Sequence, residues 1–211
     1  MENLNLLKDA IIKGNLAVAV ESTQKALAEG SDPQAMINNY MSGAMEKIGQ
    51  RFEEGKAFVP DLLMAARAMK GALEILKPLL KDDQSKRLST VVIGTVKGDL
   101  HDIGKNLVAS MLEGCGFEVV NLGTDVSSEK FIEAVKEHNA NIICLSALLT
   151  TTMNYMKEVI EALDKAGLRN KVKVMVGGAP INESFAQDIG ADGYGSNANA
   201  AVTFAKKLIA I

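Results

Sequence analysis

The stretch that decides the fold is TVVIGTVKGDLHDIGKN, residues 90–106. Its first seven residues form an apolar run of the length of a buried strand, and its last residues begin a helical segment. Between them lies a polar loop with Asp99, His101 and Gly104 in the pattern D-x-H-x-x-G. A carboxylate two residues before a histidine can bind one ring nitrogen and leave the other for a metal. The stretch therefore predicts a strand–loop–helix unit with a metal-ligating histidine after the strand.

The remainder of residues 89–211 repeats this alternation of strand and helix. We expect a helix after each of five strands, which are placed at Thr90–Val96, Phe117–Asn121, Ile142–Ser146, Val172–Val176 and near Asp192–Tyr194. Repeated units of this kind imply a parallel sheet that helices cover on both faces. Because 2-1-3-4-5 is the common order for five such strands, we predict a flavodoxin-like (Rossmann-like) α/β domain.

Residues 1–80 show apolar side chains at helical spacing only. The pattern predicts four helices with short links, near Leu4–Ile11, Leu16–Leu27, Ile37–Phe52 and Val59–Leu80. Short links between helices favour an antiparallel four-helix bundle. The polar residues 81–88 break the periodicity, so we expect a linker there between a helical domain, residues 1–80, and the α/β domain, residues 89–211.

The composition excludes several classes of protein. A net charge of −3 without a basic cluster argues against nucleic acid as a partner. The apolar runs are too short to span a membrane, and the N-terminus lacks the features of a signal peptide. Cys115 and Cys144 lie in apolar surroundings and are expected to be reduced core thiols, with a buried disulfide as the alternative. We therefore expect a cytoplasmic protein without a membrane or nucleic-acid partner.

Two further motifs are expected to meet the histidine loop. Ser146 ends the third predicted strand, and Gly177 and Gly178 end the fourth. In the expected order, strands one, three and four are neighbours, so the loops after them lie at the edge where open α/β folds bind ligands. A lone histidine in such a loop is usually an ordinary surface residue. The register of three motifs is what favours one shared site.

Together these motifs resemble the cobalamin-binding domain of corrinoid proteins. In addition, MEKIGQRFEEGK at residues 45–56 and FVPD at residues 58–61 resemble the helical cap domain of corrinoid methyltransferase proteins. The resemblance spans nearly the whole chain. It is to the cap and B12-binding domains of methionine synthase and of the corrinoid proteins of methanol, methylamine and O-demethylase systems.

The resemblance implies that cobalamin or a related corrinoid binds in the base-off form, with His101 as axial cobalt ligand. Asp99 would orient the histidine ring. The other residues that the resemblance places around the cofactor are Asp102, Gly104, Ser146, Leu148, Thr150, Thr152, Gly177 and Gly178. Several relatives carry a serine where this chain has Thr152, so a hydroxyl is retained. Phe58, Leu62 and Leu63 are candidates for contact with the upper face of the corrin, or else belong to the core of the bundle.

The resemblance also implies a function, that of a methyl carrier. A substrate-specific methyltransferase would supply the methyl group, a second methyltransferase serving tetrahydrofolate or coenzyme M would accept it, and a reductive activator would restore the cofactor. The sequence shows no substrate pocket or nucleophile pattern, so we do not expect catalysis by this chain alone. Two alternatives stay open. One is a subunit of an adenosylcobalamin mutase, which normally lacks the cap, and the other is a cobalamin-dependent regulator, which would need an output module.

Overall fold

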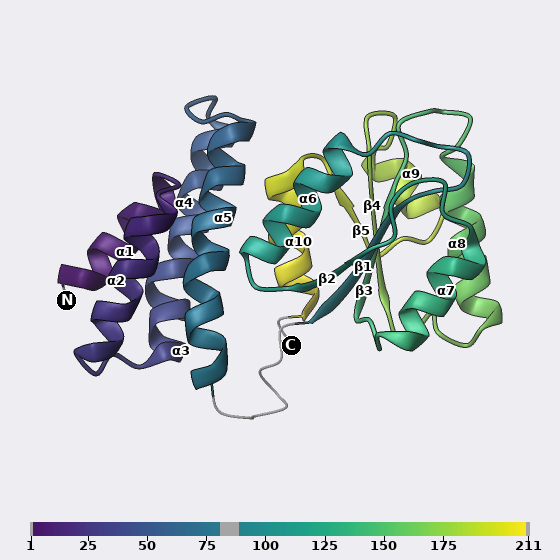
Figure 1. The fold of residues 1–211 in the computed structure, drawn as a ribbon. Coiled ribbons are helices and arrows are strands. Elements are labelled where there is room, and N and C mark those ends of the chain that lie inside the picture. Colours follow the sequence, from purple (N-terminus) through teal and green to yellow (C-terminus); the bar gives the residue numbers. More distant parts are fainter. Residues whose placement is uncertain (1, 81–88, 210–211) are drawn as a thin grey trace. The chain divides into compact units, whose positions relative to one another are not determined.

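The structure is a computed structural model that describes residues 2–80 and 89–209. The chain divides into two compact units, one all-helical and one α/β (Figure 1). The linker predicted at residues 81–88 lies outside the described residues. None of the helices in the described part of the chain has the length and apolar character needed to cross a membrane.

The helical unit contains four main helices, as the spacing predicted. The first, second and fourth are α1 (Glu2–Ile12), α2 (Leu16–Ala28) and α5 (Val59–Leu76), and a short 3-10 turn, η2 (Lys77–Leu79), follows α5. The third is not a uniform α-helix. It consists of α3 (Pro33–Met36), a π-helical turn η1 (Ile37–Met41) and α4 (Ser42–Glu53) in direct succession.

The π-helical turn has a packing consequence. The Ser42 amide donates to the carbonyl of Ile37, five residues back, so this turn is wider than an α-helical one. In a regular α-helix with 3.6 residues per turn, positions five apart point to different sides. Here Met36 and Met41 are both buried, and the core continues through Met45. The wide turn therefore keeps the apolar side of this helix facing the bundle along its whole length.

The α/β unit has the predicted sheet. All five strands are parallel in the order β2-β1-β3-β4-β5. The strands are β1 (Thr90–Thr95), β2 (Glu118–Asn121), β3 (Ile142–Ser146), β4 (Lys173–Gly177) and β5 (Gly193–Gly195). The helices are α6 (Ile103–Gly114), α7 (Ser128–Glu137), α8 (Asn154–Lys165), α9 (Glu183–Asp188) and α10 (Ala198–Ile209). Helices α6 and α10 cover one face of the sheet, and α7 and α8 cover the other (Figure 1).

The strand register aligns four small residues at the carboxyl edge of the sheet. Thr95 pairs with Ser146, Ser146 with Gly177, and Gly177 with Gly195, across β1, β3, β4 and β5. Strand β1 lies between β2 and β3 and is buried from Val91 onward, so the loop that follows it leaves from an interior strand of the sheet. The predicted convergence of the three motifs is therefore confirmed.

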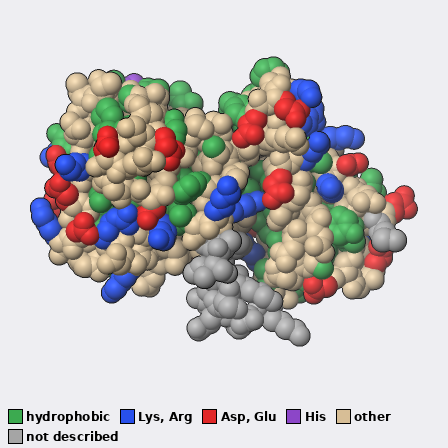
Figure 2. All heavy atoms as spheres, turned by 180° about the vertical axis from the view of Figure 1, so that it is seen from behind, with side chains coloured by type: hydrophobic (Ala, Val, Ile, Leu, Met, Phe, Trp, Pro, Cys, Tyr) green, Lys and Arg blue, Asp and Glu red, His purple; other side chains and the backbone are tan. Residues whose placement is uncertain are grey.

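The distribution of charged side chains on the surface agrees with the small net charge of the sequence. Lys and Arg side chains are interspersed with Asp and Glu on the face in Figure 2. Cys115 and Cys144 form no disulfide, as expected, but only Cys144 is a core thiol, because Cys115 is half-buried. Burial in the sheet raises the pKa of the Cys144 thiol to about 12, which makes it an inert core residue.

Candidate cofactor site at the carboxyl edge of the sheet

The centre of the site is the fully buried carboxylate of Asp99, which accepts five hydrogen bonds. Its Oδ1 accepts one hydrogen bond from Nδ1 of His101 at 2.7 Å and another from the His101 amide at 3.1 Å. Its Oδ2 accepts the amides of Leu148 and Leu149 at 2.7 and 3.2 Å, and Thr152 Oγ1 at 2.8 Å. The carboxylate thus joins the loop after β1 to the loop after β3.

These donors set the charge of Asp99. Burial alone raises the pKa of a carboxyl group. At Asp99 the amide of Leu148, the ring and amide of His101 and the hydroxyl of Thr152 outweigh that effect and hold the pKa well below its usual range. Asp99 is therefore a fixed buried anion, and its charge faces Nδ1 of His101.

The imidazole of His101 is held on one side and open on the other. Its Nδ1 faces Asp99, while half of the side-chain surface is exposed. The His101 carbonyl accepts the hydroxyl of buried Thr95 at 2.8 Å, which fixes the backbone at this residue. Since Nδ1 is engaged, Nε2 is the nitrogen available to a ligand. The neighbouring residues Leu100 and Ile103 are 73% and 86% exposed, so the loop that carries the histidine also presents apolar surface.

A residue that the sequence did not single out completes this loop. Asp125, with a left-handed φ of +53°, accepts the Gly98 amide at 2.7 Å, and its own amide donates to the Asp99 carbonyl at 3.0 Å. Gly98 also has a positive φ, +79°. Such backbone conformations are costly for a residue with a side chain and persist where neighbouring contacts fix them. A chain segment beyond β2 therefore braces the turn that presents Asp99.

A second polar cluster lies beside the first, toward β2. Asp102 Oδ2 accepts Asn106 Nδ2 at 2.8 Å, and Asn106 Oδ1 accepts both Lys105 Nζ and Asn121 Nδ2. Lys105 Nζ also donates to Asn121 Oδ1 at 2.8 Å. Asp102 was predicted as a site residue, whereas Lys105, Asn106 and Asn121 were not. Only proximity in the fold brings Asn121 into this cluster.

The predicted glycine positions differ in how much space the surrounding chain leaves for a side chain. Gly178 has a φ of +129°, and a Cβ there would lie 1.8 Å from the carbonyl oxygen of Ala147. A Cβ at Gly177 would lie 3.1 Å from the carbonyl oxygen of Gly195. Close approach of neighbouring backbone thus requires glycine at Gly178, whereas the contact at Gly177 is only tight. At Gly104, by contrast, a Cβ would meet nothing within 4 Å, so the packing of this chain does not require glycine there.

The other predicted residues after β3 take different roles. Leu148 contributes its backbone amide to Asp99, while its side chain is exposed. Thr152 is buried, and Thr150 is exposed. Ser146 is half-buried at the end of β3, and its carbonyl accepts the Val96 amide.

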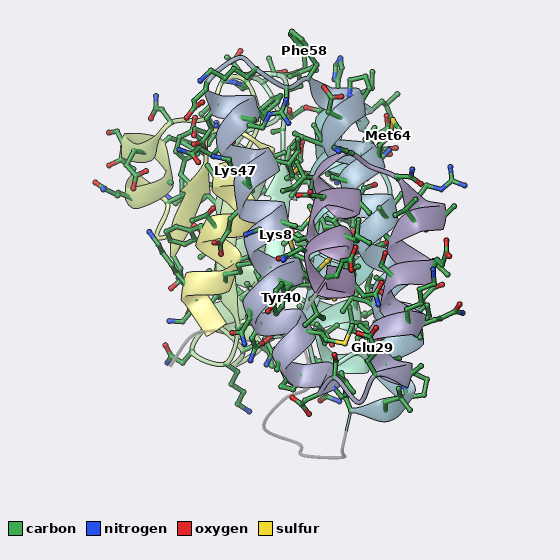
Figure 3. All side chains as sticks on the ribbon, turned by 90° about the vertical axis from the view of Figure 1, so that its left-hand side faces the viewer. Lys8, Glu29, Tyr40, Lys47, Phe58 and Met64 are labelled. Carbon is green, nitrogen blue, oxygen red and sulfur yellow. The ribbon has the colours of Figure 1, made fainter. Side chains whose placement is uncertain are left out.

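In the helical unit, the three predicted corrin contacts separate into two kinds. Leu62 is fully buried, so of the two alternatives it belongs to the core and is not a corrin contact. Phe58 and Leu63 are exposed, at 68% and 40%. Figure 3 shows Phe58 projecting outward at one end of the helical unit. Met64 on the same helix is also exposed.

The metal-binding side chains of this site suit a metal ion that is already bound in a macrocycle. Among the described residues, no cluster of three or more His, Cys, Asp or Glu side chains could hold a bare metal ion. A corrin would bring its own ring nitrogens to the metal, so that a single protein nitrogen, such as the one on the exposed side of His101, would suffice. The apolar side chains beside His101 and the open space at Gly104 fit a large flat ligand. The residues present therefore fit a corrinoid.

Comparison with known proteins gives the same result. A family model described as a B12 binding domain matches residues 89–203, and a second model of that description matches residues 4–77. A dimethylamine corrinoid protein of Methanosarcina barkeri is 47% identical over 210 residues, 99% of this chain and 98% of its own length. A trimethylamine corrinoid protein of Methanosarcina mazei is 44% identical over 206 residues, 97% of this chain and 94% of its own length.

A solved structure extends the likeness to the fold of both parts. A chain in the methanol:cobalamin methyltransferase complex of Methanosarcina barkeri is similar with a TM-score of 0.83 and 34% identity. The match covers 99% of this chain and 80% of that one. The chain therefore belongs to the corrinoid proteins of methylamine and methanol methyltransferase systems, with an N-terminal helical cap and a B12-binding domain.

Proposed function

We propose that this chain is a methyl carrier that binds cobalamin or a related corrinoid in the base-off form, with Nε2 of His101 as the axial ligand. The observation that carries the proposal is the buried Asp99 anion, which engages Nδ1 of His101 and leaves the opposite ring nitrogen exposed. When bound, the corrinoid supplies the cobalt on which the methyl group is carried. The chain's own residues orient that cobalt and shield it.

The residues of the site have different roles in holding the cofactor. Asp99 keeps a proton on Nδ1, so that Nε2 presents its lone pair outward. Thr152 donates its hydroxyl to the same carboxylate and would share in the proton balance of the pair formed by Asp99 and His101. Asp102, Gly104, Ser146, Leu148 and Thr150, with Gly177 and Gly178, form the surroundings of the cofactor and its nucleotide tail. Phe58 and Leu63, exposed at one end of the cap, are suited to cover the reactive face.

The partners follow from a carrier role. We propose a substrate-specific methyltransferase as donor partner, because a similar chain occurs in a methanol:cobalamin methyltransferase complex. The relatives named for trimethylamine and dimethylamine favour a methylamine as the original methyl donor. A second methyltransferase serving coenzyme M or tetrahydrofolate would accept the methyl group, and a reductive activator would restore an oxidised cofactor. The chain itself would not catalyse transfer alone, and we place it in the cytoplasm.

The binding mode can be tested on reconstituted protein. Protein labelled uniformly with nitrogen-15 would be loaded with unlabelled cobalamin and reduced to the cobalt(II) state. Electron paramagnetic resonance should show coupling of the unpaired electron to one nitrogen-15 nucleus, from His101. Coupling to nitrogen-14 of the cofactor's own base would refute the His-on mode.

The carrier role needs a separate test. Protein loaded with cofactor in its most reduced state would be mixed with candidate methylamine methyltransferases and their donors, and the absorbance of the cofactor followed. Methylation that depends on both enzyme and donor is expected. Support of carbon-skeleton rearrangement with a mutase large subunit, without methylation under any condition, would favour the mutase alternative.

A further inference from the structure

We propose that Lys105 is a positioning residue for His101, acting through Asn106 and Asp102 rather than by touching the cofactor. This inference rests on the proposed function, since it concerns the same histidine. The side chain of Lys105 is only 3% exposed, although it begins in the first turn of α6 beside an exposed loop. A lysine is rarely buried to this extent unless its ammonium is paired, so its partners carry the argument.

The partners of Lys105 are neutral oxygens. Its Nζ donates to Oδ1 of Asn106 and to Oδ1 of Asn121, and within the described chain no carboxylate lies at ion-pair distance from it. Burial lowers the pKa of Lys105, and the nearby charge of Asp102 opposes that shift. A salt bridge would explain a buried lysine as a simple stabilising pair. Two amide oxygens instead give the ammonium an orienting role.

The ammonium fixes which way the Asn106 amide faces. Because Oδ1 of Asn106 is turned toward Lys105 and toward Nδ2 of Asn121, its Nδ2 group is left to donate to Asp102 Oδ2 at 2.8 Å. The opposite rotamer would place an amide oxygen against the Asp102 carboxylate and an amide nitrogen against the ammonium, and both contacts are repulsive. Lys105 thus fixes the direction, or polarity, of the hydrogen bonds that run from Asn121 through Asn106 to Asp102.

That polarity matters because Asp102 is the residue after the histidine. The loop around His101 is held at three points: Asp99 binds the ring and amide, Thr95 binds the carbonyl, and the cluster around Lys105 holds Asp102. Asn121 Oδ1 in turn accepts a hydrogen bond from the amide of Gly123, whose carbonyl accepts one from the Thr95 amide, so the cluster is tied to β1. Without the third anchor, the backbone at residues 101–103 can shift, which loosens the contact between Asp99 and Nδ1 of His101.

The test compares Lys105→Met with the wild-type protein and with Lys97→Met. Methionine keeps the length and apolar stem of lysine but cannot donate. Lys97 is an exposed lysine four residues before His101, so its loss controls for the removal of one positive charge near the site. Asn121→Ala is a second variant in case Lys105→Met does not fold. It removes one acceptor of the ammonium from the far side of the cluster.

The first readout needs no cofactor. Histidine labelled with nitrogen-15 gives only two ring systems, His101 and His138, which His138→Gln tells apart. In spectra recorded at about pH 8, wild-type His101 should hold a proton on Nδ1, the nitrogen that faces Asp99. In folded Lys105→Met and Asn121→Ala, a mixture of ring tautomers is expected, whereas Lys97→Met should match the wild type.

The second readout is the ratio of histidine-bound to histidine-free cobalt in the cobalt(II) state, from electron paramagnetic resonance. Lys105→Met should lower this ratio by about tenfold, the lower end of what losing a partner behind a metal-ligating histidine costs. Folded variants with wild-type ring signals and a wild-type ratio would overturn the role of Lys105 and leave the proposed function standing. Absence of histidine coupling in the wild type would instead refute the binding mode itself.

Discussion

The hydroxyl of Thr152 lies 2.8 Å from Oδ2 of Asp99, the oxygen opposite the one that faces His101. The same hydroxyl lies 2.9 Å from the carbonyl oxygen of Leu149, so one proton serves two acceptors. The methyl group of Thr152 is accommodated because it faces Gly98, where even a Cβ would stand 3.5 Å away. Thr152 therefore completes a contact chain from histidine through carboxylate to hydroxyl.

Replacing Thr152 with Val should destabilise the protein without cofactor. Valine keeps the shape but withdraws one donor from a buried carboxylate, and such a loss costs about 1–3 kcal/mol. Urea unfolding of the apo protein measures the difference. Thr152→Ser retains the donor and should stay within about 1 kcal/mol of the wild type. Thr151→Val, at an exposed neighbouring position, is the matched control, and an equal loss there would deny Thr152 a special role.

The charge of Asp99 predicts a dependence of stability on pH. A carboxyl group whose folded pKa lies below its unfolded value stabilises the folded state above the unfolded pKa, near 3.9 for Asp, and loses this contribution as pH falls further. Asp99→Asn cannot titrate, so its free energy of unfolding should fall less steeply in acid. We expect the advantage of the wild type over Asp99→Asn to shrink as the pH falls below about 4. An advantage that still grew below about pH 4 would contradict a lowered pKa.

Replacing His101 with Ala should separate affinity from transfer. The axial nitrogen is lost, but the apolar and backbone surfaces of the site remain, so cofactor binding should weaken less than methyl transfer with the partner enzymes. Equilibrium titration by absorbance gives the first quantity, and a coupled transfer assay gives the second. His138→Ala alters the residue that ends α7 and should change neither the binding affinity nor the transfer rate. Transfer at the wild-type rate by His101→Ala would show that the histidine is not the working ligand.

The sequence predicted the sheet and the centre of the site for one physical reason. Parallel strands joined by helices bring their carboxyl ends to one edge, so the order of the strands placed Asp99, Ser146 and Gly177 together. The pairing of Asp99 with His101 depends on residues only two positions apart, and local spacing suffices to predict it. Thr152 as the hydroxyl partner came from the resemblance to relatives.

Other features carry no signature in one sequence. The amides of Leu148 and Leu149 bind Asp99 through the backbone, which every residue but proline possesses. Lys105 meets Asn121 across sixteen positions, and nothing in either residue type indicates the partner. The π-helical turn at Ile37–Met41 is a change of hydrogen-bond register that the apolar spacing did not indicate. Leu62 fitted either the bundle core or a corrin contact until its burial was known.

The two kinds of glycine give the sharpest test of where the cofactor lies. Gly178→Ala places a Cβ against the carbonyl of Ala147 at a left-handed φ, so it should destabilise the apo protein by about 3 kcal/mol or more. Gly104→Ala adds a methyl group to open space on α6 and should stabilise the apo protein by up to about 1 kcal/mol, because alanine favours the helix. Thermal unfolding of both variants without cofactor measures these opposite effects. If a corrin approaches the helix at Gly104, the same methyl group must then weaken cofactor binding, so this variant should gain stability and lose affinity. A Gly104→Ala protein that is stabilised and still binds cobalamin with wild-type affinity would show that the ligand does not approach α6 at this residue.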